Sequence, residues 1–256
     1  MNYHCIGYKY DIISKIGEGG FGVVYKARDI RKNQIVTIKQ IKKKIQPNEE
    51  IPQYILREMD ILEEFKGCSN IIDLRDFHLT NTNENVYFVY DYYEYDIQNL
   101  IYQREPMTMR QVKSYMKQMI IALLTVHSKN YIHGDIKPNN FIISSKNEIK
   151  LIDFGVSLKV DQKNKSTKIG TYGYNAPELI LGDTEYGIEI DIWSLGCTFY
   201  EMMTKNKLIY HCYSNSEIAD QIIQIFDYPN KNDFPQFFSL PNAELFLNCM
   251  RISKSS

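Results

Sequence analysis

Hydrophobic and polar positions alternate along most of the first ninety residues, and this alternation predicts strands. Four segments rich in β-branched and aromatic residues show it: residues 10–16, 23–28, 34–40 and 86–90. Between them, residues 51–65 repeat apolar side chains at three- and four-residue spacing, which predicts a helix. We therefore expect the first part of the chain to be a small β-rich unit with one helix.

The pattern changes after residue 93. Residues 110–127 carry a long amphipathic repeat with its apolar side chains on one side, which predicts a helix. Residues 188–203 are apolar almost all round, which is typical of a helix buried in the middle of a domain. A strand-rich part is thus followed by a helix-rich part, and the expected class is α+β.

Composition narrows the function classes. The chain has 256 residues, of which 44% are hydrophobic and 24% charged, so it is not a wholly disordered protein. Its formal net charge of −1 gives no general attraction to nucleic acid or to an anionic membrane. The five scattered cysteines favour neither a disulfide framework nor a zinc site. With no signal peptide or membrane span expected, the predicted location is the nucleus, the cytoplasm or both.

A glycine-rich stretch, Gly17-Glu18-Gly19-Gly20-Phe21-Gly22-Val23-Val24, is the first motif with chemical content. Glycines at these spacings let backbone amides approach phosphate oxygens. A strand follows rather than a helix, which favours a strand–loop–strand cover over a nucleotide and not a dinucleotide-binding turn. Taken alone, the stretch is equally consistent with a glycine-rich hairpin turn.

Lys39 ends a strand in which Val36 and Ile38 share one face and Thr37 shares the other with Lys39. A lone lysine there is usually solvated. Glu58, on the next predicted helix, is an acid able to hold the ammonium of Lys39 on the phosphates of a nucleotide. The simpler interpretation of Glu58 is a surface charge.

Two later motifs contain the residues of a phosphoryl-transfer site. In His133-Gly134-Asp135-Ile136-Lys137-Pro138-Asn139-Asn140, the acid can accept a hydroxyl proton, the lysine can neutralise the transferred phosphoryl group and Asn140 can bind a metal ion. In Asp153-Phe154-Gly155, the carboxylate at the end of a buried strand suits Mg²⁺. Each motif alone is also a common turn.

Further along, Ala176-Pro177-Glu178 precedes Asp191 in the apolar helix. A buried acid needs hydrogen-bond partners, so we expect Asp191 to be structural and to hold the backbone around His133.

Together and in this order, the motifs resemble those of eukaryotic Ser/Thr protein kinases over residues 10–256. The resemblance implies a bilobal fold: an antiparallel β-rich N-lobe of about residues 1–91, a hinge at about 91–94 and a larger helical C-lobe of about 95–256. It implies ATP in the cleft between the lobes, Mg²⁺ on Asn140 and Asp153, and catalysis by Asp135, Lys137, Lys39 and Glu58. The implied ATP-binding residues are Ile16, Gly17, Glu18, Gly19, Gly20, Phe21, Gly22, Val23, Val24, Lys39, Asp91, Tyr93, Asp96 and Ile142.

The narrower resemblance is to cyclin-dependent kinases. Pro52-Gln53-Tyr54-Ile55-Leu56-Arg57-Glu58 is similar to the helix on which cyclins dock, and Glu94-Tyr95-Asp96-Ile97 places Asp96 near the ribose. Lys137 and Thr171 match the Ser/Thr pattern. The resemblance implies protein substrates, no nucleic acid or membrane partner, and a monomer that binds a cyclin-type subunit.

Departures from that family raise specific questions. Gly134 replaces the arginine that usually grips a phosphate near Ser166 and Thr167, so we expect phosphorylation there to have little effect. Tyr90 is expected to close the back of the ATP pocket. The arginine that usually pairs with the acid at Glu178 is not at its expected place, so either that segment is missing or Glu178 is paired differently. A pseudokinase scaffold and a cyclin-independent Ser/Thr kinase are the alternatives, and preference for proline after the phosphoacceptor stays open.

Overall fold

The structure is a computed structural model, and it describes residues 8–19, 22–41, 51–79, 85–103, 105–163, 165–227, 230, 232 and 235–244. The chain divides into two compact units. The first unit comprises residues 1–95 and 142–155, and the second comprises residues 96–141 and 156–256. The segment 142–155 thus belongs with the strand-rich part, although it comes later in the sequence. The lobe limits expected from the sequence stay a prediction.

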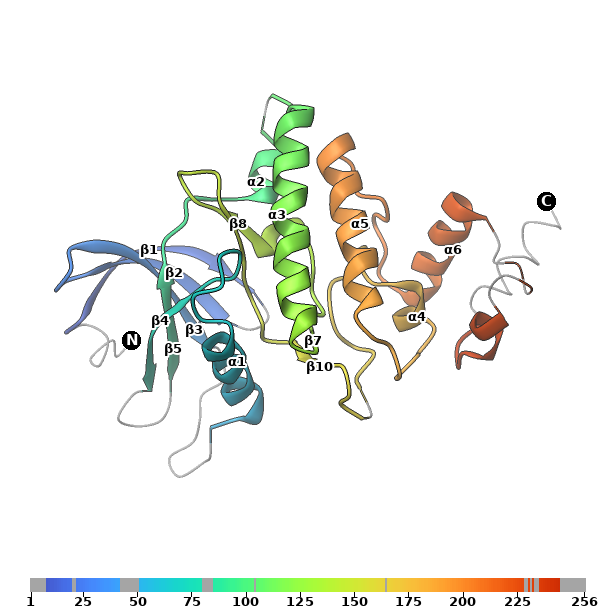
Figure 1. Cartoon of the computed structure of the whole chain (residues 1–256), viewed down its shortest axis with the longest axis horizontal. Helices are drawn as coiled ribbons and strands as arrows, with labels where there is room; N and C mark the ends of the chain where they lie inside the picture. The colour runs from blue at the N-terminus through green and yellow to red at the C-terminus, as the bar shows by residue number, and fades with distance from the viewer. Residues whose placement is uncertain are drawn as a thin grey trace. The chain divides into compact units, whose positions relative to one another are not determined.

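A five-stranded antiparallel sheet forms the first unit, in the order β1-β2-β3-β5-β4 (Figure 1). Its strands are β1 (Tyr10–Glu18), β2 (Gly22–Asp29), β3 (Gln34–Ile41), β4 (Leu74–Leu79) and β5 (Val86–Asp91). The predicted strands are confirmed, each ending one or two residues beyond its predicted limits. The predicted helix is α1 (Gln53–Glu64). Strand β4 was not predicted, because the charged residues in Leu74-Arg75-Asp76-Phe77-His78-Leu79 hide its pattern.

Apolar side chains on one face of the sheet form a hydrophobic core of the first unit. Buried apolar residues of four strands meet on one face: Tyr10, Ala27, Val36, Ile38, Tyr87 and Val89. Because successive residues of a strand point to opposite faces, Lys39 lies on the face away from this core. The short strands β8 (Phe141–Ile143) and β9 (Ile149–Leu151) belong to a three-stranded sheet in the order β6-β8-β9, where β6 is Tyr95–Asp96. Backbone hydrogen bonds join β9 to the segment after α1, from Ile72 N to Leu151 O and from Leu151 N to Asn70 O.

The second unit is mainly helical. After β6 (Tyr95–Asp96), it contains α2 (Ile97–Ile101), α3 (Met109–Ser128), the paired strands β7 (Tyr131–Ile132) and β10 (Leu158–Lys159), α4 (Pro177–Ile180), α5 (Glu189–Thr204) and α6 (Asn215–Phe226). Short 3₁₀ turns, η1 (Pro138–Asn140) and η2 (Pro235–Ser239), connect some of them. The long helices α3 and α5 lie side by side (Figure 1).

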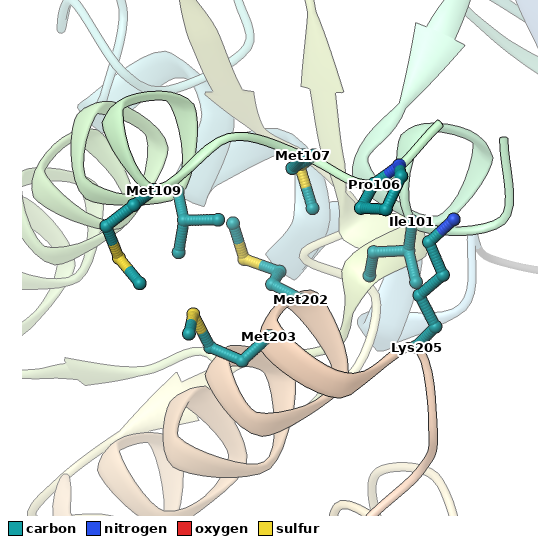
Figure 2. Close-up of a pocket in the computed structure, with 8 residues that line it drawn as sticks. Ile101, Pro106, Met107, Met109, Met202, Met203 and Lys205 are labelled. Carbon is teal, nitrogen blue, oxygen red and sulfur yellow. The ribbon is translucent and has the colours of Figure 1, made fainter. Parts of the chain in front are cut away.

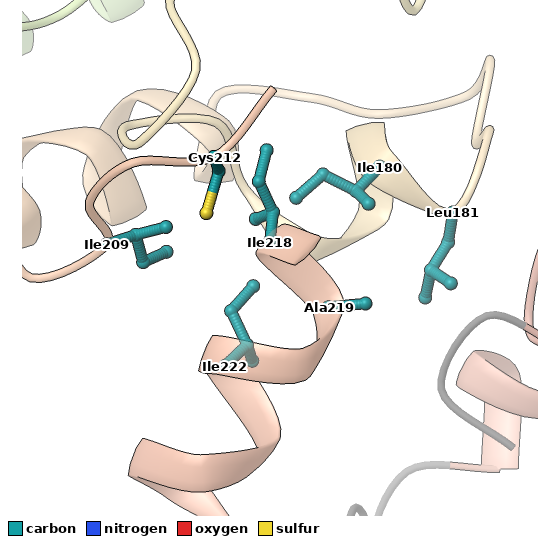
Figure 3. Packing of buried hydrophobic residues seen from close by; sticks show 7 residues of the cluster. All are labelled: Ile180, Leu181, Ile209, Cys212, Ile218, Ala219 and Ile222. Carbon is teal, nitrogen blue, oxygen red and sulfur yellow. The ribbon is translucent and has the colours of Figure 1, made fainter. Parts of the chain in front are cut away.

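Capping residues fix where these helices begin. The Thr108 side chain accepts a hydrogen bond from the Gln111 amide, and the Gln111 side chain accepts one from the Thr108 amide; this capping box begins α3. Ser214 and Glu217 form the same kind of capping box at the start of α6, a helix that the sequence did not predict. Its apolar face packs into a cluster with residues around α4 (Figure 3): Ile180, Leu181, Ile209, Cys212, Ile218, Ala219 and Ile222.

Helix α5 differs from its predicted all-round burial. One face is buried and includes Ile190, Leu195 and Met202. Ile192 and Phe199 remain 55% and 42% exposed. Within the described residues, no helix is long and apolar enough to cross a lipid bilayer.

Candidate active site

Strands β1 and β2 flank the glycine-rich stretch and pair antiparallel, so a strand lies on each side of it, as predicted. Glu18 is paired with Val23, and the amide of Gly19 donates to Gly22 O at 2.9 Å. A Cβ atom at Gly22 would lie only 2.2 Å from Gln40 O on β3, so only glycine fits this close approach of two strands. Ile16, Gly17 and Val24 lie on the same hairpin, while Gly20 and Phe21 lie outside the described residues.

Lys39 is held between two carboxylates of the first unit. Its Nζ lies 2.7 Å from Glu58 Oε1 and 2.8 Å from Asp153 Oδ1. Strand β3, helix α1 and the turn after β9 each supply one of these residues. Lys39 and Asp153 are 114 positions apart in the sequence. The predicted ion pair of Lys39 with Glu58 is present, and we call these three residues the Lys39 group.

Burial and charge oppose each other at Lys39. Its side chain is 12% exposed and that of Glu58 is 3% exposed. Burial alone would disfavour the ammonium, but the attraction of Glu58 and Asp153 outweighs it and raises the pKa of Lys39 above its ordinary value. Asp153 adopts a left-handed backbone with φ of 68°, which is uncommon for a residue other than glycine. The structure thus keeps a fixed positive charge beside a strained, carboxylate-bearing turn.

Asp135 lies at the centre of a hydrogen-bonded group in the second unit. Lys137 Nζ is 2.7 Å from Asp135 Oδ2 and 2.8 Å from Thr171 Oγ1, and Thr171 Oγ1 donates to Asp135 Oδ1 at 2.6 Å. Asp135 is 7% exposed. Both oxygens of one buried carboxylate are therefore oriented by neighbours, and a cation lies directly beside it.

Asn140 joins the same group from the 3₁₀ turn η1. Its amide nitrogen donates to Asp135 O at 2.7 Å and to Asp135 Oδ2 at 3.2 Å. These bonds fix the amide so that its carbonyl oxygen faces elsewhere, available as a ligand for a hard cation. We call Asp135, Lys137, Asn140 and Thr171 the Asp135 group.

Asp191 fixes the backbone before Asp135, as expected. Its carboxylate accepts hydrogen bonds from the amides of His133 and Gly134 at 2.8 and 2.9 Å, and it lies 2.8 Å from His127 Nε2. Asp191 is 1% exposed, so these bonds replace water around the carboxylate. Helix α5 thereby holds in place the loop that carries Asp135.

The remaining predicted ATP-binding residues lie in or next to strands β5, β6 and β8. Asp91, the last residue of β5, forms an ion pair with Arg75 at 2.8 Å. Burial, and then the nearby Asp91, raise the pKa of Tyr93 to about 12. Asp96 of the second unit caps α2 by accepting from the amide of Asn99 at 2.7 Å. Ile142 is half-buried in β8.

Tyr90 and Glu178, about which the sequence raised questions, are both half-buried. Tyr90 lies in β5, and its ring stacks on Phe88 with centroids 6.3 Å apart. Burial, and then the charges of Glu58 and Asp153, raise the pKa of Tyr90 well above its ordinary value. Glu178 is half-buried, and no lysine or arginine among the described residues forms an ion pair with it; burial raises its pKa.

Sequence reasoning missed one buried acid. Glu201 of α5 is 0% exposed and accepts from Tyr102 Oη at 2.7 Å and from Tyr174 Oη at 2.5 Å. The signal that identified Asp191, an acid within an apolar helix, applies equally to Glu201. Tyr174 belongs to the stretch just before Ala176-Pro177-Glu178, so this contact fixes that stretch against α5.

A small cavity of about 50 Å³ lies elsewhere in the second unit (Figure 2). None of the predicted site residues lines it. Its walls come from the ends of α2, α3 and α5: Ile101, Pro106, Met107, Met109, Val112, Met202, Met203 and Lys205.

Comparison with known proteins agrees with this arrangement. The model of the protein kinase domain matches residues 10–255, so the chain belongs to the protein kinase family. Serine/threonine-protein kinase ppk23 of Schizosaccharomyces pombe is 36% identical over 241 residues, which are 91% of this chain and 59% of that protein. Probable cyclin-dependent kinase 10 of Dictyostelium discoideum is 35% identical over 245 residues, 93% of this chain and 66% of that protein.

Cell division control protein 2 homolog 1 of Trypanosoma brucei brucei is 31% identical and covers 95% of this chain and 80% of that protein. The crystal structure of the yeast RNA Pol II CTD kinase CTDK-1 complex contains a chain with a TM-score of 0.81 and 26% identity. The match covers 93% of this chain and 74% of that one. This chain therefore has the kinase fold, and its curated relatives are Ser/Thr and cyclin-dependent kinases. This chain spans only 59% of the first relative's length.

Proposed function

We propose that this protein is an ATP-dependent serine/threonine protein kinase that transfers the γ-phosphoryl group of ATP to a Ser or Thr hydroxyl. The observation that carries the proposal is the Asp135 group. A buried carboxylate, oriented by Thr171 and Asn140 with the ammonium of Lys137 beside it, is a suitable acceptor for a hydroxyl proton next to a transferring phosphate.

In the proposed reaction, proton transfer and phosphoryl transfer occur together. Asp135 takes the proton from the substrate hydroxyl as its oxygen forms a bond to the γ-phosphorus. The bond from the γ-phosphorus to the bridging oxygen breaks, and ADP leaves with that electron pair. Lys137 offsets the negative charge that spreads over the transferred group. The protein mainly orients the reactants and stabilises charge.

The Lys39 group supports ATP binding. Lys39 stays charged because Glu58 and Asp153 surround it, so it offers a fixed cation to the phosphates of the nucleotide. Residues of the β1–β2 hairpin supply backbone amides, with Gly22 admitting the close strand approach.

Each of the two groups carries an oxygen donor that suits Mg²⁺. Asp153 and Asn140 supply carboxylate and amide oxygens, the ligand atoms that this cation prefers. When bound, Mg²⁺ neutralises charge on the phosphate oxygens of ATP. The bonds from Asn140 to Asp135 and from Lys39 to Asp153 hold both ligands before any metal arrives.

We further propose that a cyclin-type subunit activates the kinase by contacting α1. The helix turns Ile55, Glu58, Ile61 and Leu62 into the first unit and leaves Gln53 and Asp60 exposed. A partner on the exposed side would act on Glu58 through the same helix. Relatives named as cyclin-dependent kinases support this partner class.

A phosphate-transfer assay tests both proposals. Purified protein would be incubated with labelled ATP, Mg²⁺ and a peptide library, with and without candidate cyclins. We expect label on Ser or Thr and stimulation by at least one cyclin. Nucleotide binding with no transfer under any condition would instead indicate a pseudokinase, and equal transfer with and without every cyclin would indicate a cyclin-independent kinase.

A further inference from the structure

Lys165 is a buried lysine in the segment of residues 156–175, which we call the activation segment. It is 5% exposed, and its Nζ donates to Val160 O at 2.9 Å. No carboxylate of the described residues lies within ion-pair distance of it. A buried ammonium is costly unless it has partners, so the observed contacts must hold it in place.

Tyr186 supplies the second contact. The ammonium of Lys165 lies 5.3 Å from the centroid of its ring, and the hydroxyl of Tyr186 donates to Ser166 O at 2.8 Å. Tyr186 is 1% exposed and belongs to a buried cluster with Leu158 and Ile190. Two consecutive residues of the activation segment are thereby attached to one rigid side chain of the second unit.

The attachment continues toward the Asp135 group. Asn175 Nδ2 donates to Ile169 O at 3.1 Å, three positions after Ser166. Thr171 follows and donates to Asp135 at 2.6 Å. Separate contacts therefore hold the activation segment at Lys165, Ser166, Ile169 and Thr171, and the last of them reaches the proposed proton acceptor.

Position 134 offers no side chain to bind a phosphate on this segment. Gly134 has φ of 80°, a conformation that favours glycine, and a Cβ atom there would lie 3.3 Å from Ile169 Cδ1. The activation segment packs against the place from which an arginine would reach out. Its order must come from contacts within the protein.

We propose that Lys165 is a positioning residue for phosphoryl transfer: with Tyr186, it holds the activation segment in its substrate-accepting arrangement, with no phosphate on Ser166 or Thr167. This proposal rests on the proposed kinase function. The ammonium acts through Val160 O and the ring of Tyr186, and it touches neither ATP nor the reacting atoms.

Steady-state kinetics on phosphatase-treated protein tests the proposal. Lys165→Met removes the cation at nearly constant length, and Lys168→Met, at an exposed position of the same segment, is the matched control. We expect Lys165→Met to raise the peptide KM by roughly three- to tenfold, the effect of losing one buried hydrogen bond, with the ATP KM unchanged. Lys165→Arg should recover most of the loss, and Lys168→Met should behave as the parent.

Hydrogen exchange provides a readout that does not need activity. In Lys165→Met, the amides of residues 160–169 should exchange at least several-fold faster, while those of α3 and α5 keep their protection. A Tyr186→Phe variant, which loses only the bond to Ser166 O, should accelerate exchange in the same residues.

The outcomes separate the two proposals. If the parent transfers no phosphate but exchange accelerates in Lys165→Met and not in Lys168→Met, the kinase function fails and the attachment stands. If Lys165→Met matches Lys168→Met in exchange and in peptide KM, the positioning role is wrong. It is also wrong if phosphatase treatment alone abolishes the activity of the parent protein.

Discussion

Lys137 places its ammonium 2.7 Å from a carboxylate oxygen of Asp135, and both side chains are largely withdrawn from water. The pair explains how a carboxylate can take a proton beside a group that already carries several negative charges. In the proposed reaction, the lysine compensates for the charge of the phosphate and also orients the carboxylate.

Lys137→Met should therefore reduce kcat and leave nucleotide binding intact. We expect a loss of about 10²–10³ in kcat, the size seen when one transition-state charge partner is removed, with an unchanged KM for ATP. Steady-state kinetics at varied ATP measures both. A raised ATP KM with normal kcat would place Lys137 in ground-state nucleotide binding.

The ion pair of Lys39 and Glu58 should behave as one unit. Lys39→Met and Glu58→Gln should each lower kcat/KM for ATP, and the double variant should lose little more than Lys39→Met alone, because both remove the same charge placement. A double-mutant cycle on kcat/KM measures the coupling. Strictly additive losses would mean that the two residues act independently.

The raised pKa of Lys39 gives a pH prediction for stability. A raised folded pKa stabilises the native state fully below the unfolded value of about 10.4 and loses this contribution as pH rises through the folded value. The difference in free energy of unfolding between the parent and Lys39→Met should thus be flat between about pH 7 and 9. A steady fall across that window, measured by urea unfolding, would contradict the assignment.

Asp191→Asn should destabilise the fold without touching the chemistry directly. The variant keeps one acceptor oxygen but loses charged hydrogen bonds to the amides of His133 and Gly134. We expect a loss of about 2–3 kcal/mol in the free energy of unfolding. Asp161→Asn, at an exposed position, is the control in the same urea titration. Equal stability of the two variants would show that Asp191 is not a structural anchor.

Tyr90 should set which inhibitors enter the ATP site. The ring is large and stacked on Phe88, so ATP-competitive compounds with a bulky group beyond adenine should be excluded. Tyr90→Ala should increase sensitivity to such compounds at least tenfold, while compounds without the group should inhibit both proteins alike. Dose–response curves against the parent protein check this, and identical curves would reject it.

Removing the hydroxyls of Ser166 and Thr167 should matter little. With Gly134 in place of a phosphate-binding arginine, the Ser166→Ala/Thr167→Ala variant should keep its activity within about twofold of the parent. A large loss of activity in this double variant would show that phosphorylation there is required.

The sequence was most informative where a pattern is local. Strict alternation around Lys39 predicted which face it occupies, and apolar spacing predicted α1, α3 and α5 within two residues at each end. The structural role of Asp191 followed from the cost of burying an acid.

Long-range features were harder to predict. Lys165 lies in a polar stretch where a lysine is normally solvated, and its burial depends on Tyr186, twenty-one positions later. Strand β4 carries three titratable side chains, so it has no clean period. Helix α6 is as long as α1, and the capping pair Ser214 and Glu217 at its start is a sequence signal that could have predicted it. The open face of α5 was not foreseen, because hydrophobicity alone does not say which side chains find a neighbour.

The most direct test of the central claim is phosphate transfer by Asp135→Asn. This variant keeps size and polarity but cannot accept the hydroxyl proton. We predict a loss of roughly 10²–10⁴ in transfer rate, with nucleotide binding close to that of the parent. A variant that folds, binds ATP and transfers phosphate as fast as the parent would contradict the assignment of Asp135 as the proton acceptor.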